Sequence, residues 1–399
     1  MNKRRSKKLK QVSLILIIFL TILASTGCWN NRDLTEMAIA TAIGFDKTKD
    51  GKLKVTLQIV KPGIIKAKAQ GNQERAVWIH SAIGKTAFEA IRNSLKTIDR
   101  KVVFSHNQIV VISEEVAKEG IIGILELFER NQNINELSEI LVAKESKGLT
   151  AEKVLKAESE LEDIPAIHMV NIIKSNLKSL AKIRKVSVFK LLKVLNSKGR
   201  SPVIGMIHLN KQIDNVKIKD LKIEGAAVFK KDRLIGWLGP IETRGLLFPL
   251  NEVGSTVITL PNPMDKKEEL DFEILSSQGE IDVKLKNGEL TFLIKIDTKG
   301  KLVSQQGKGD LTKPKIVKKL EKEVASVIKN EIRNTVKLAQ FKYESDIFGF
   351  SELVHNKHLD YWKEVENNWV EVFSKTPVKI EVTWNTMSTG LIKKPTRPR

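Results

Sequence analysis

Cysteine is almost absent from this sequence: Cys28 is the only one among 399 residues. A single cysteine cannot form an internal disulfide, and once its thiol is modified it leaves no thiolate nucleophile or thiolate metal ligand. The stability of the folded chain must therefore come from apolar cores. Without the first 27 residues, 399 − 27 = 372 residues remain, enough for about two or three such cores.

The motifs of common enzyme classes are also missing. The sequence has no glycine-rich phosphate loop, no Gly-x-Ser-x-Gly elbow and no His-Glu-x-x-His pair. We therefore expect no catalytic residue, no cofactor and no metal site. His355 and His358 could share a metal ion, but the sequence offers no third ligand, and a solvated or packed helix face is preferred. His106 is interpreted as a turn residue bonded to backbone, in preference to a catalytic role.

The N-terminus does contain a secretory signal. Six cations come first, and an apolar run over residues 12–23 follows. This run is shorter than the roughly 20 residues that span a bilayer. Small residues then lead to Cys28, which is the pattern of a lipoprotein processing site. We expect residues 1–27 to be a signal peptide and Cys28 to become the acylated first residue, because two or more acyl chains give a stable anchor. The alternative is a buried free cysteine behind a signal-like anchor.

The remaining chain is strongly basic. Removal of six cations leaves 68 − 6 = 62 Lys and Arg against 47 Asp and Glu, a net charge of 62 − 47 = +15. Such a surface is attracted to anionic lipid headgroups or acidic polymers. Nucleic acid is not expected as a partner, since export removes the chain from it and no basic motif carries interleaved aromatics.

The pattern after Cys28 predicts an α+β domain. Residues 37–46 and 53–60 read as a hairpin of two strands. The turn between them resembles a calcium loop, but Leu57 stands where that loop needs a bidentate glutamate, so a plain turn is preferred. Further on we expect a helix over residues 86–98, with one apolar face, and then strands and helices in alternation. The members of that face are Phe88, Ile91, Leu95 and Ile98.

Residues 151–196 are helical in pattern, and Pro165 is placed to begin a helix within them. The polar segment 196–202 is the best linker candidate, so we place a domain boundary near residue 200. The expected organisation is a signal peptide at 1–27, an N-terminal α+β region at 28–200, a C-terminal α+β region at 201–390 and a basic tail at 391–399.

The C-terminal region is predicted to combine antiparallel or mixed sheets with amphipathic helices. Strands are expected at 223–230 and 234–238, with residues 242–248 following, and Asn287-Gly288 predicts a type I′ hairpin turn. A long amphipathic helix begins at Pro314. A second helix is expected over 351–373, where Trp362 and Trp369 are interpreted as core residues in preference to a ligand platform. A strand at 378–384 completes the region.

The sequence resembles one protein family over nearly its whole length. The chain is similar to the GerAC-type C subunits of spore nutrient-germinant receptors. The motifs that support the resemblance are Gly27-Cys28-Trp29, Ile43-Gly44-Phe45-Asp46, Val103-Phe104-Ser105-His106-Asn107, Glu162-Asp163-Ile164-Pro165-Ala166, Glu242-Thr243-Arg244-Gly245-Leu246-Leu247 and Asp346-Ile347-Phe348-Gly349-Phe350. The chain departs from the family at Ser351, which can cap the following helix, and at Asn131 and Asn133, where relatives carry acids.

The resemblance implies a multi-domain α+β lipoprotein on the outer face of the spore's inner membrane. It implies a non-enzymatic subunit that acts with two integral-membrane partners, the A and B subunits, in nutrient-triggered germination. The alternative is a stand-alone exported lipoprotein that binds a small ligand or an anionic cell-wall polymer through its basic surface.

Overall fold

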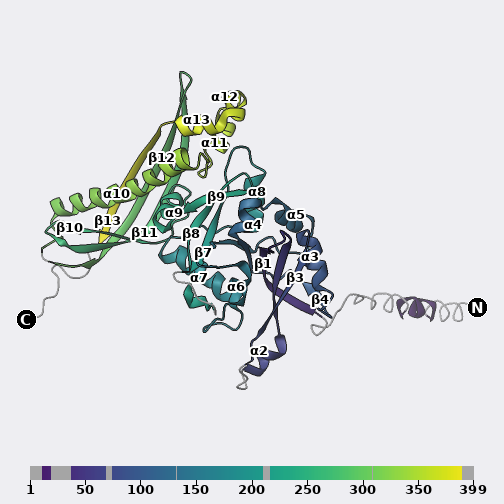
Figure 1. The fold of residues 1–399 in the computed structure, drawn as a ribbon. Coiled ribbons are helices and arrows are strands. Elements are labelled where there is room, and N and C mark those ends of the chain that lie inside the picture. The colour runs from purple at the N-terminus through teal and green to yellow at the C-terminus, as the bar shows by residue number, and fades with distance from the viewer. Residues whose placement is uncertain are drawn as a thin grey trace, which may run out of the picture.

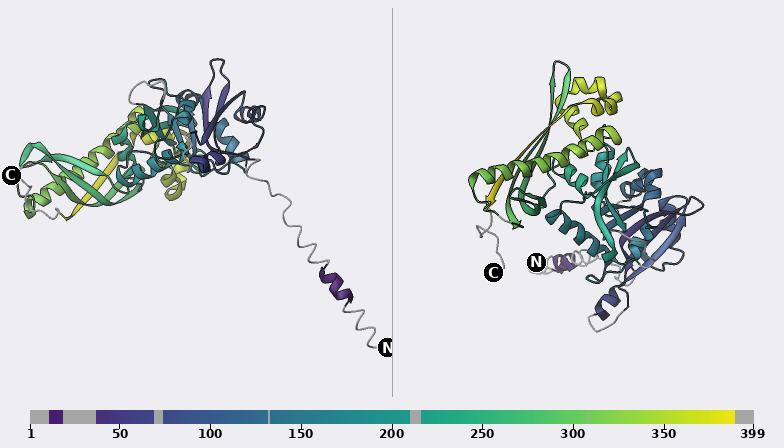
Figure 2. Two further views of the ribbon diagram at one scale, coloured as in Figure 1. Left: turned by 90° about the horizontal axis from the view of Figure 1, so that it is seen from below. Right: turned by 60° about the vertical axis from the view of Figure 1, so that its left-hand side comes forward.

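The computed structural model describes residues 11–18, 37–68, 74–131, 133–209, 216–307 and 309–388. Its described part is an α+β fold with two sheets, and Figure 1 shows them at opposite ends of the molecule. The expected fold class is confirmed. The second view in Figure 2 separates the sheets in the same way, with the C-terminal sheet at the end distant from β1 and β3.

The large sheet begins with the predicted hairpin. β1 (Met37–Lys47) pairs antiparallel with β2 (Leu53–Val60), and β3 (Val77–Gly84) extends this edge after the short helix α2 (Pro62–Lys68). Next come β5 (Ile109–Ser113), β6 (Glu139–Ala143) and β7 (Val203–Leu209), all parallel to β1. The other edge is the antiparallel pair β8 (Leu221–Lys230) and β9 (Arg233–Leu238), and the short β4 (Lys101–Val103) pairs with the start of β1.

Helices cover both faces of the central parallel strands, so all five residues of β5 are buried, as expected of a parallel sheet. One face packs against four helices, α3 (Ala87–Ser94), α4 (Glu114–Glu119), α5 (Ile122–Arg130) and α8 (Val188–Leu195). The other packs against α6 (Ala151–Lys156) and α7 (Pro165–Ser179), which begins at the predicted proline.

The small sheet has four strands in the order β10 (Val257–Asn262), β11 (Asp265–Lys286), β12 (Glu289–Gln305) and β13 (Val378–Ser388). Asn287 and Gly288 have φ angles of 50° and 78°, which confirms the predicted hairpin turn between β11 and β12. The long helix α10 (Pro314–Lys337) lies along this sheet in Figure 1 and buries its predicted apolar stripe. β13 runs parallel to β12.

Two expectations about helices were wrong. The helix expected over 351–373 is divided into α11 (Phe350–Lys357), α12 (Leu359–Val365) and α13 (Trp369–Lys375). His358, with φ −138° and ψ 61°, separates the first two, and a 3-10 turn at Glu366–Asn368 separates the last two. The helix expected from residue 151 ends at Lys156. Residues 242–248, for which no element was predicted, belong mostly to helix α9 (Pro240–Leu247).

The apolar face predicted for the helix at α3 is confirmed for only two of its four residues. Ile91 and Ile98 are buried, whereas the side chains of Phe88 and Leu95 are 53% and 42% exposed. Small residues take the inward positions instead, since Ala87 and Ala90 are buried. This leaves two large apolar side chains on the surface of the large-sheet region.

The large sheet continues past residue 200 through β7, β8 and β9. The segment predicted to be a linker contacts the C-terminal region directly: the Ser201 N–H donates to the Asp346 carbonyl at 2.9 Å, and the Arg200 guanidinium binds Glu352 at 3.0 Å. A domain boundary near residue 200 stays a prediction.

Candidate functional site

The predicted lipid-attachment residue, Cys28, lies outside the described residues, as does the basic tail 391–399. The nearest described residue after Cys28 is Met37, at the start of β1.

The calcium-loop alternative for the turn between β1 and β2 can be tested, because Asp46 is described. Its carboxylate accepts hydrogen bonds from the N–H groups of Ala151 and Glu152, both at 2.8 Å, and so caps α6. Burial raises the pKa of the Asp46 carboxyl, although these two hydrogen bonds act to lower it. The preferred plain turn between β1 and β2 is confirmed.

The three histidines singled out from the sequence do not converge. His106 lies in the turn after β4, which confirms its predicted position, and its side chain is exposed. The His355 ring lies edge-on to Trp362, with ring centroids 6.0 Å apart, and His358 ends α11. Within the described ranges, no three His, Cys, Asp or Glu side chains gather in a way that could hold a metal ion.

Trp362 and Trp369 are buried core residues, as predicted, with ring centroids 5.2 Å apart. They come from α12 and α13, two separate helices of the aromatic core. Phe292 on β12 stacks on Phe350 at 4.0 Å and also faces Trp369 at 6.0 Å. This cluster joins the turn end of the β11–β12 hairpin to the three short helices.

The Asp346-to-Phe350 motif organises the start of α11. The buried Asp346 carboxylate accepts hydrogen bonds from the N–H groups of Gly349, Phe350 and Ser351, at 2.8, 3.1 and 2.7 Å. Complete burial raises the pKa of Asp346, while these donors act to lower it. The expected cap by Ser351 was therefore wrong: Ser351 lies inside the helix, and the carboxylate five residues earlier satisfies the free N–H groups.

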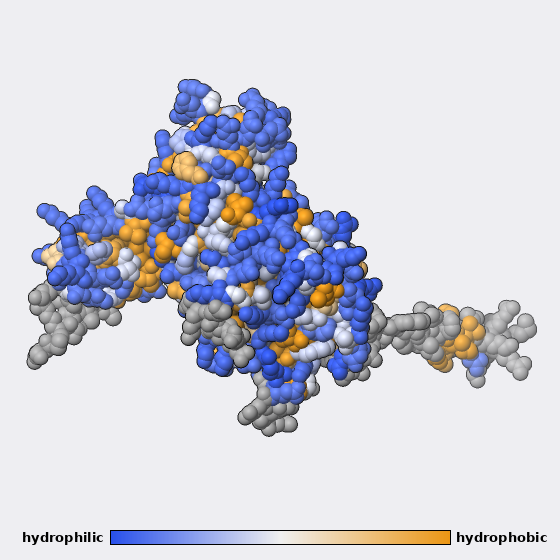
Figure 3. Space-filling model, viewed as in Figure 1, coloured by the Kyte–Doolittle hydropathy of each residue, from blue (hydrophilic) through white to orange (hydrophobic). Residues whose placement is uncertain are grey.

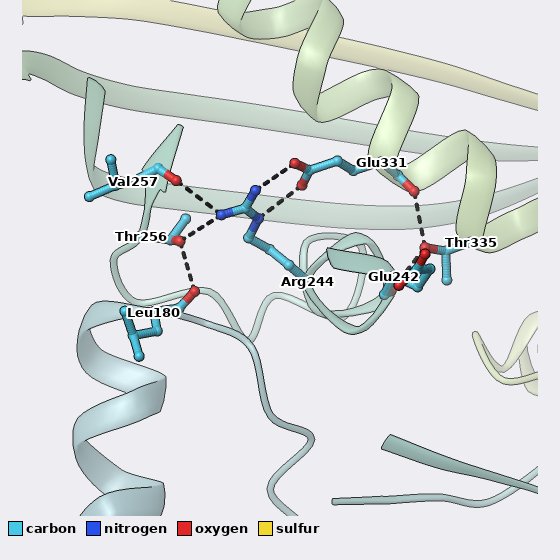
Figure 4. Close-up of polar contacts among 7 residues, drawn as sticks. All are labelled: Leu180, Glu242, Arg244, Thr256, Val257, Glu331 and Thr335. Atoms are coloured by element: carbon cyan, nitrogen blue, oxygen red, sulfur yellow. Dashed lines mark hydrogen bonds and ion pairs between the residues drawn. The ribbon is translucent and has the colours of Figure 1, made fainter. Parts of the chain in front are cut away.

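The Glu242-to-Leu247 motif forms the junction of α9 and α10 (Figure 4). Arg244 binds Glu331 with two hydrogen bonds of 2.9 and 2.5 Å, and its guanidinium also donates to Thr256 Oγ1 and the Val257 carbonyl. Thr256 in turn donates to the Leu180 carbonyl at 2.7 Å, at the end of α7. One buried guanidinium thus connects α9 to α10 and to β10, and through Thr256 to the large-sheet helix α7.

Sequence reasoning missed Glu331. A signal was available, because Glu331 is an acid on the apolar stripe of α10, three residues after Ile328 and one before Ile332. A lone acid at such a position needs a buried cationic partner. Arg244 could not be singled out from the other cations by sequence pattern.

Two grooves with apolar lining flank α3. On one side, a groove of about 440 Å³ lies between α3 and the helices α4 and α5. Its apolar lining includes Phe88, Val116, Ile124 and Leu127, and Lys85 and Glu119 lie at its rim. On the other side, a groove of about 500 Å³ runs between α3 and β4 and includes Leu95. We call these two grooves with α3 the α3 surface.

Several apolar side chains near α3 are exposed. Figure 3 shows that apolar side chains on the drawn face form small, separate patches within a mostly hydrophilic surface. Ile83, Phe88, Leu95 and Ile122, on β3, α3 and α5, are each between 42% and 53% exposed. Asn131, one of the three positions at which the chain departs from the family pattern, lines both grooves. Clustered exposed apolar residues of this kind mark interaction sites more often than isolated ones do.

Two family models match consecutive parts of the chain. The spore germination protein N-terminal domain matches residues 30–209. The domain described as spore germination B3/GerAC like, C-terminal, matches residues 224–390. Together these matches cover both sheets.

Relatives with the same extent occur in Bacillus subtilis. Spore germination protein KC is 26% identical over 398 residues, covering 96% of this chain and 97% of that protein. Spore germination protein B3 is 25% identical, covering 97% and 100%. The crystal structure of the GerBC protein matches with a TM-score of 0.55 and 20% identity, over 86% of this chain and 96% of that one. This last likeness shows the fold.

Proposed function

Because the chain belongs to the GerAC-type family of spore germination proteins, we propose that it is the C subunit of a spore nutrient-germinant receptor. In this role it is anchored by acylated Cys28 and acts with integral-membrane A and B subunits. The observation that carries the proposal is the match of both domain models, in order, along almost the whole chain.

Membrane anchoring is proposed through the lipid on Cys28. No helix among the described residues is long and apolar enough to cross a membrane. The signal-like segment followed by Cys28 supports acylation at the outer face of the spore's inner membrane. An anchor of two or more acyl chains confines the body to the membrane and raises its effective concentration for membrane partners.

We further propose that the subunit acts by binding and performs no catalysis. Its family is not a known enzyme family. The buried ionisable side chains Asp46, Arg244, Glu331 and Asp346 are engaged in connecting or capping secondary-structure elements. These side chains hold the two sheets in place, which is a structural task.

The α3 surface is the proposed docking site for a membrane subunit. The floor of its first groove is apolar, with Val116, Ile124 and Leu127 buried beneath the exposed ring of Phe88. Arg92 lies over that ring at 5.6 Å and holds it at the surface. An apolar floor with a charged rim is the usual composition of a protein interface.

The direct test is germination of spores that lack this gene. Dipicolinate release is measured with a panel of nutrients and with a receptor-independent agent. Loss of the response to one nutrient, with an unchanged response to the receptor-independent agent, supports the receptor role. Restoration by the wild-type gene is the control. A deletion strain that responds normally to every nutrient argues against it when other receptors are also deleted.

A stand-alone binding lipoprotein is the second candidate. The observation that favours it is the groove of about 440 Å³, which falls in the size range of small-molecule sites. This candidate predicts salt-sensitive binding of an anionic polymer, or saturable binding of a small ligand, by the chain without any partner. The receptor proposal instead predicts co-purification with two membrane subunits.

A further inference from the structure

The length of chain between the lipid and the fold limits which surface can face the membrane. Met37 is 37 − 28 = 9 residues from Cys28, a span of at most about 30 Å when fully extended. The start of β1 therefore lies close to the headgroups if Cys28 is acylated. This step rests on the proposed anchoring.

A hollow of about 360 Å³ opens at the start of β1. Its lining combines Met37 with the end of β2, the start of α2, Trp78 on β3 and the segment before β4. The Trp78 side chain is 39% exposed, and Ile64 of α2 is half-buried beside it. A tryptophan with an exposed edge beside charged groups is typical of side chains placed at a membrane interface.

The segments around this hollow are strongly basic. Residues 61–68, 74–78 and 96–101 contain seven Lys and Arg and two acids, a net charge of 7 − 2 = +5. Both acids have a basic partner: Glu74 binds Lys61 at 2.7 Å, and Asp99 lies 3.9 Å from Arg100. Arg100 and Lys101 are exposed. Such a cluster is attracted to a negatively charged bilayer surface.

We propose that this surface, the β4–α2 edge (residues 61–65, 78 and 98–101), faces the membrane and binds anionic lipid headgroups. The lipid at Cys28 then attaches beside it, and the four-stranded sheet points away from the bilayer, since it lies at the other end of the molecule in Figures 1 and 2. The α3 surface borders this edge, because Ile98 and Arg100 line both its second groove and the hollow.

The single natural cysteine allows a clean test. Once Cys28 carries the lipid, an introduced cysteine is the only free thiol. Gly63→Cys places a probe on the β4–α2 edge, where an added Cβ meets nothing within 4 Å. Asn385→Cys on β13 is the control, since Asn385 is exposed and belongs to the four-stranded sheet. Each variant is purified in acylated form, labelled with an environment-sensitive fluorophore and placed in vesicles with and without phosphatidylglycerol.

We expect the probe at residue 63 to show a blue-shifted emission and protection from aqueous iodide on anionic vesicles, and the probe at residue 385 to show neither. Arg100→Glu with Lys101→Glu should reduce the fraction of protected probe at residue 63 by about tenfold. The control pair, Lys284→Glu with Lys286→Glu beside the β11–β12 turn, should leave the fraction of protected probe unchanged.

Three results overturn the proposal and can be told apart. Protein that floats with vesicles but leaves both probes exposed to iodide refutes the orientation and leaves the anchor intact. Protection at residue 63 that does not depend on anionic lipid shows that the hollow holds protein, such as the chain's own segment before Met37. Protein that lacks the added lipid mass and does not float refutes the anchoring. It also removes the limit that the short segment between Cys28 and Met37 sets on the orientation.

Discussion

Arg244 and Glu331 face each other across the contact of α9 and α10, and hydrogen bonds of 2.9 and 2.5 Å join the guanidinium to both carboxylate oxygens. The two side chains are only 7% and 9% exposed. Charges this deeply buried are costly to take out of water, and they are tolerated only when paired. The pair therefore specifies how the helices meet more than it adds stability.

The first prediction concerns this pair. Glu331→Ala should lower the free energy of unfolding by about 3–5 kcal/mol, because it leaves a buried cation without its partner. Arg244→Met combined with Glu331→Leu should recover most of that loss. Urea unfolding of the chain without its signal peptide measures both. Equal losses in the single and the double variant would contradict the argument, and Glu371→Ala, at an exposed ion pair, is the control.

The second prediction concerns the glycine beside Arg244. A Cβ on Gly245 would lie 2.4 Å from Thr335 Oγ1 and 2.6 Å from the Glu331 carbonyl oxygen. Gly245→Ala should therefore push α9 from α10 and destabilise the fold by about 1–3 kcal/mol. Gly123→Ala, where the space is open, should be neutral or stabilising. Thermal unfolding of both variants measures the contrast, and equal midpoints would refute the close helix contact.

A third prediction is that the stabilising contribution of one ion pair near the β11–β12 turn depends on pH. Asp282 on β11 binds Lys357 on α11 at 2.5 Å, and this hydrogen bond lowers the pKa of the Asp282 carboxyl. A carboxyl with a lowered pKa in the folded state stabilises the fold above its unfolded pKa of about 4 and loses that contribution as the pH falls below it.

Asp282→Asn should thus lower the unfolding midpoint at pH 7 and make no difference near pH 2. The effect should stay under about 1 kcal/mol, because the carboxylate is partly exposed. Asp360→Asn is the control, since that carboxylate is 99% exposed and its ion pair is longer, at 3.4 Å. A difference between wild type and Asp282→Asn that grows on acidification would have the wrong sign for this mechanism.

The fourth prediction tests the α3 surface. Phe88→Ser should reduce co-purification with the A and B subunits and slow the nutrient response, while the fold stays intact. Phe189→Ser on α8 is a matched control, because both rings are 53% exposed and Phe189 lies on a different helix. Circular dichroism checks the fold of each variant. If the two substitutions have the same effect on co-purification, the α3 surface is not the docking site.

The last prediction concerns Cys28. Cys28→Ala should leave the body folded, since residues from Met37 onward form both sheets and their hydrophobic cores, but should abolish the lipid mass and weaken assembly with membrane subunits. Mass spectrometry and membrane fractionation measure the two effects. A variant that is released from the membrane and still supports a full germination response would refute the proposed role of the anchor.

Several features could be predicted from the sequence because short-range rules govern them. The β1–β2 hairpin follows from alternating apolar residues, and the β11–β12 turn follows from Asn287-Gly288, since few residue pairs adopt two positive φ angles. The stripe on α10 likewise follows from its three- and four-residue spacing.

The α3 face and the helix break at His358 could not be predicted in this way. Phe88 and Leu95 have the spacing of core residues, but Ala87 and Ala90 face the sheet because the helix packs closely against it. The expected long helix after residue 350 is interrupted at His358 and again at Glu366–Asn368, and the second interruption lies between Trp362 and Trp369, whose rings pack in one aromatic cluster.

The sequence by itself determined the hairpins, the amphipathic helices, the excess of positive charge and the family to which the chain belongs. Only the tertiary structure decided that β13 runs parallel to β12, that Glu331 is the partner of Arg244, and that Asp346 caps α11 in place of Ser351. The physical reason is range: local propensities act over a few residues, whereas a buried charge finds its partner through contacts between segments far apart in the chain.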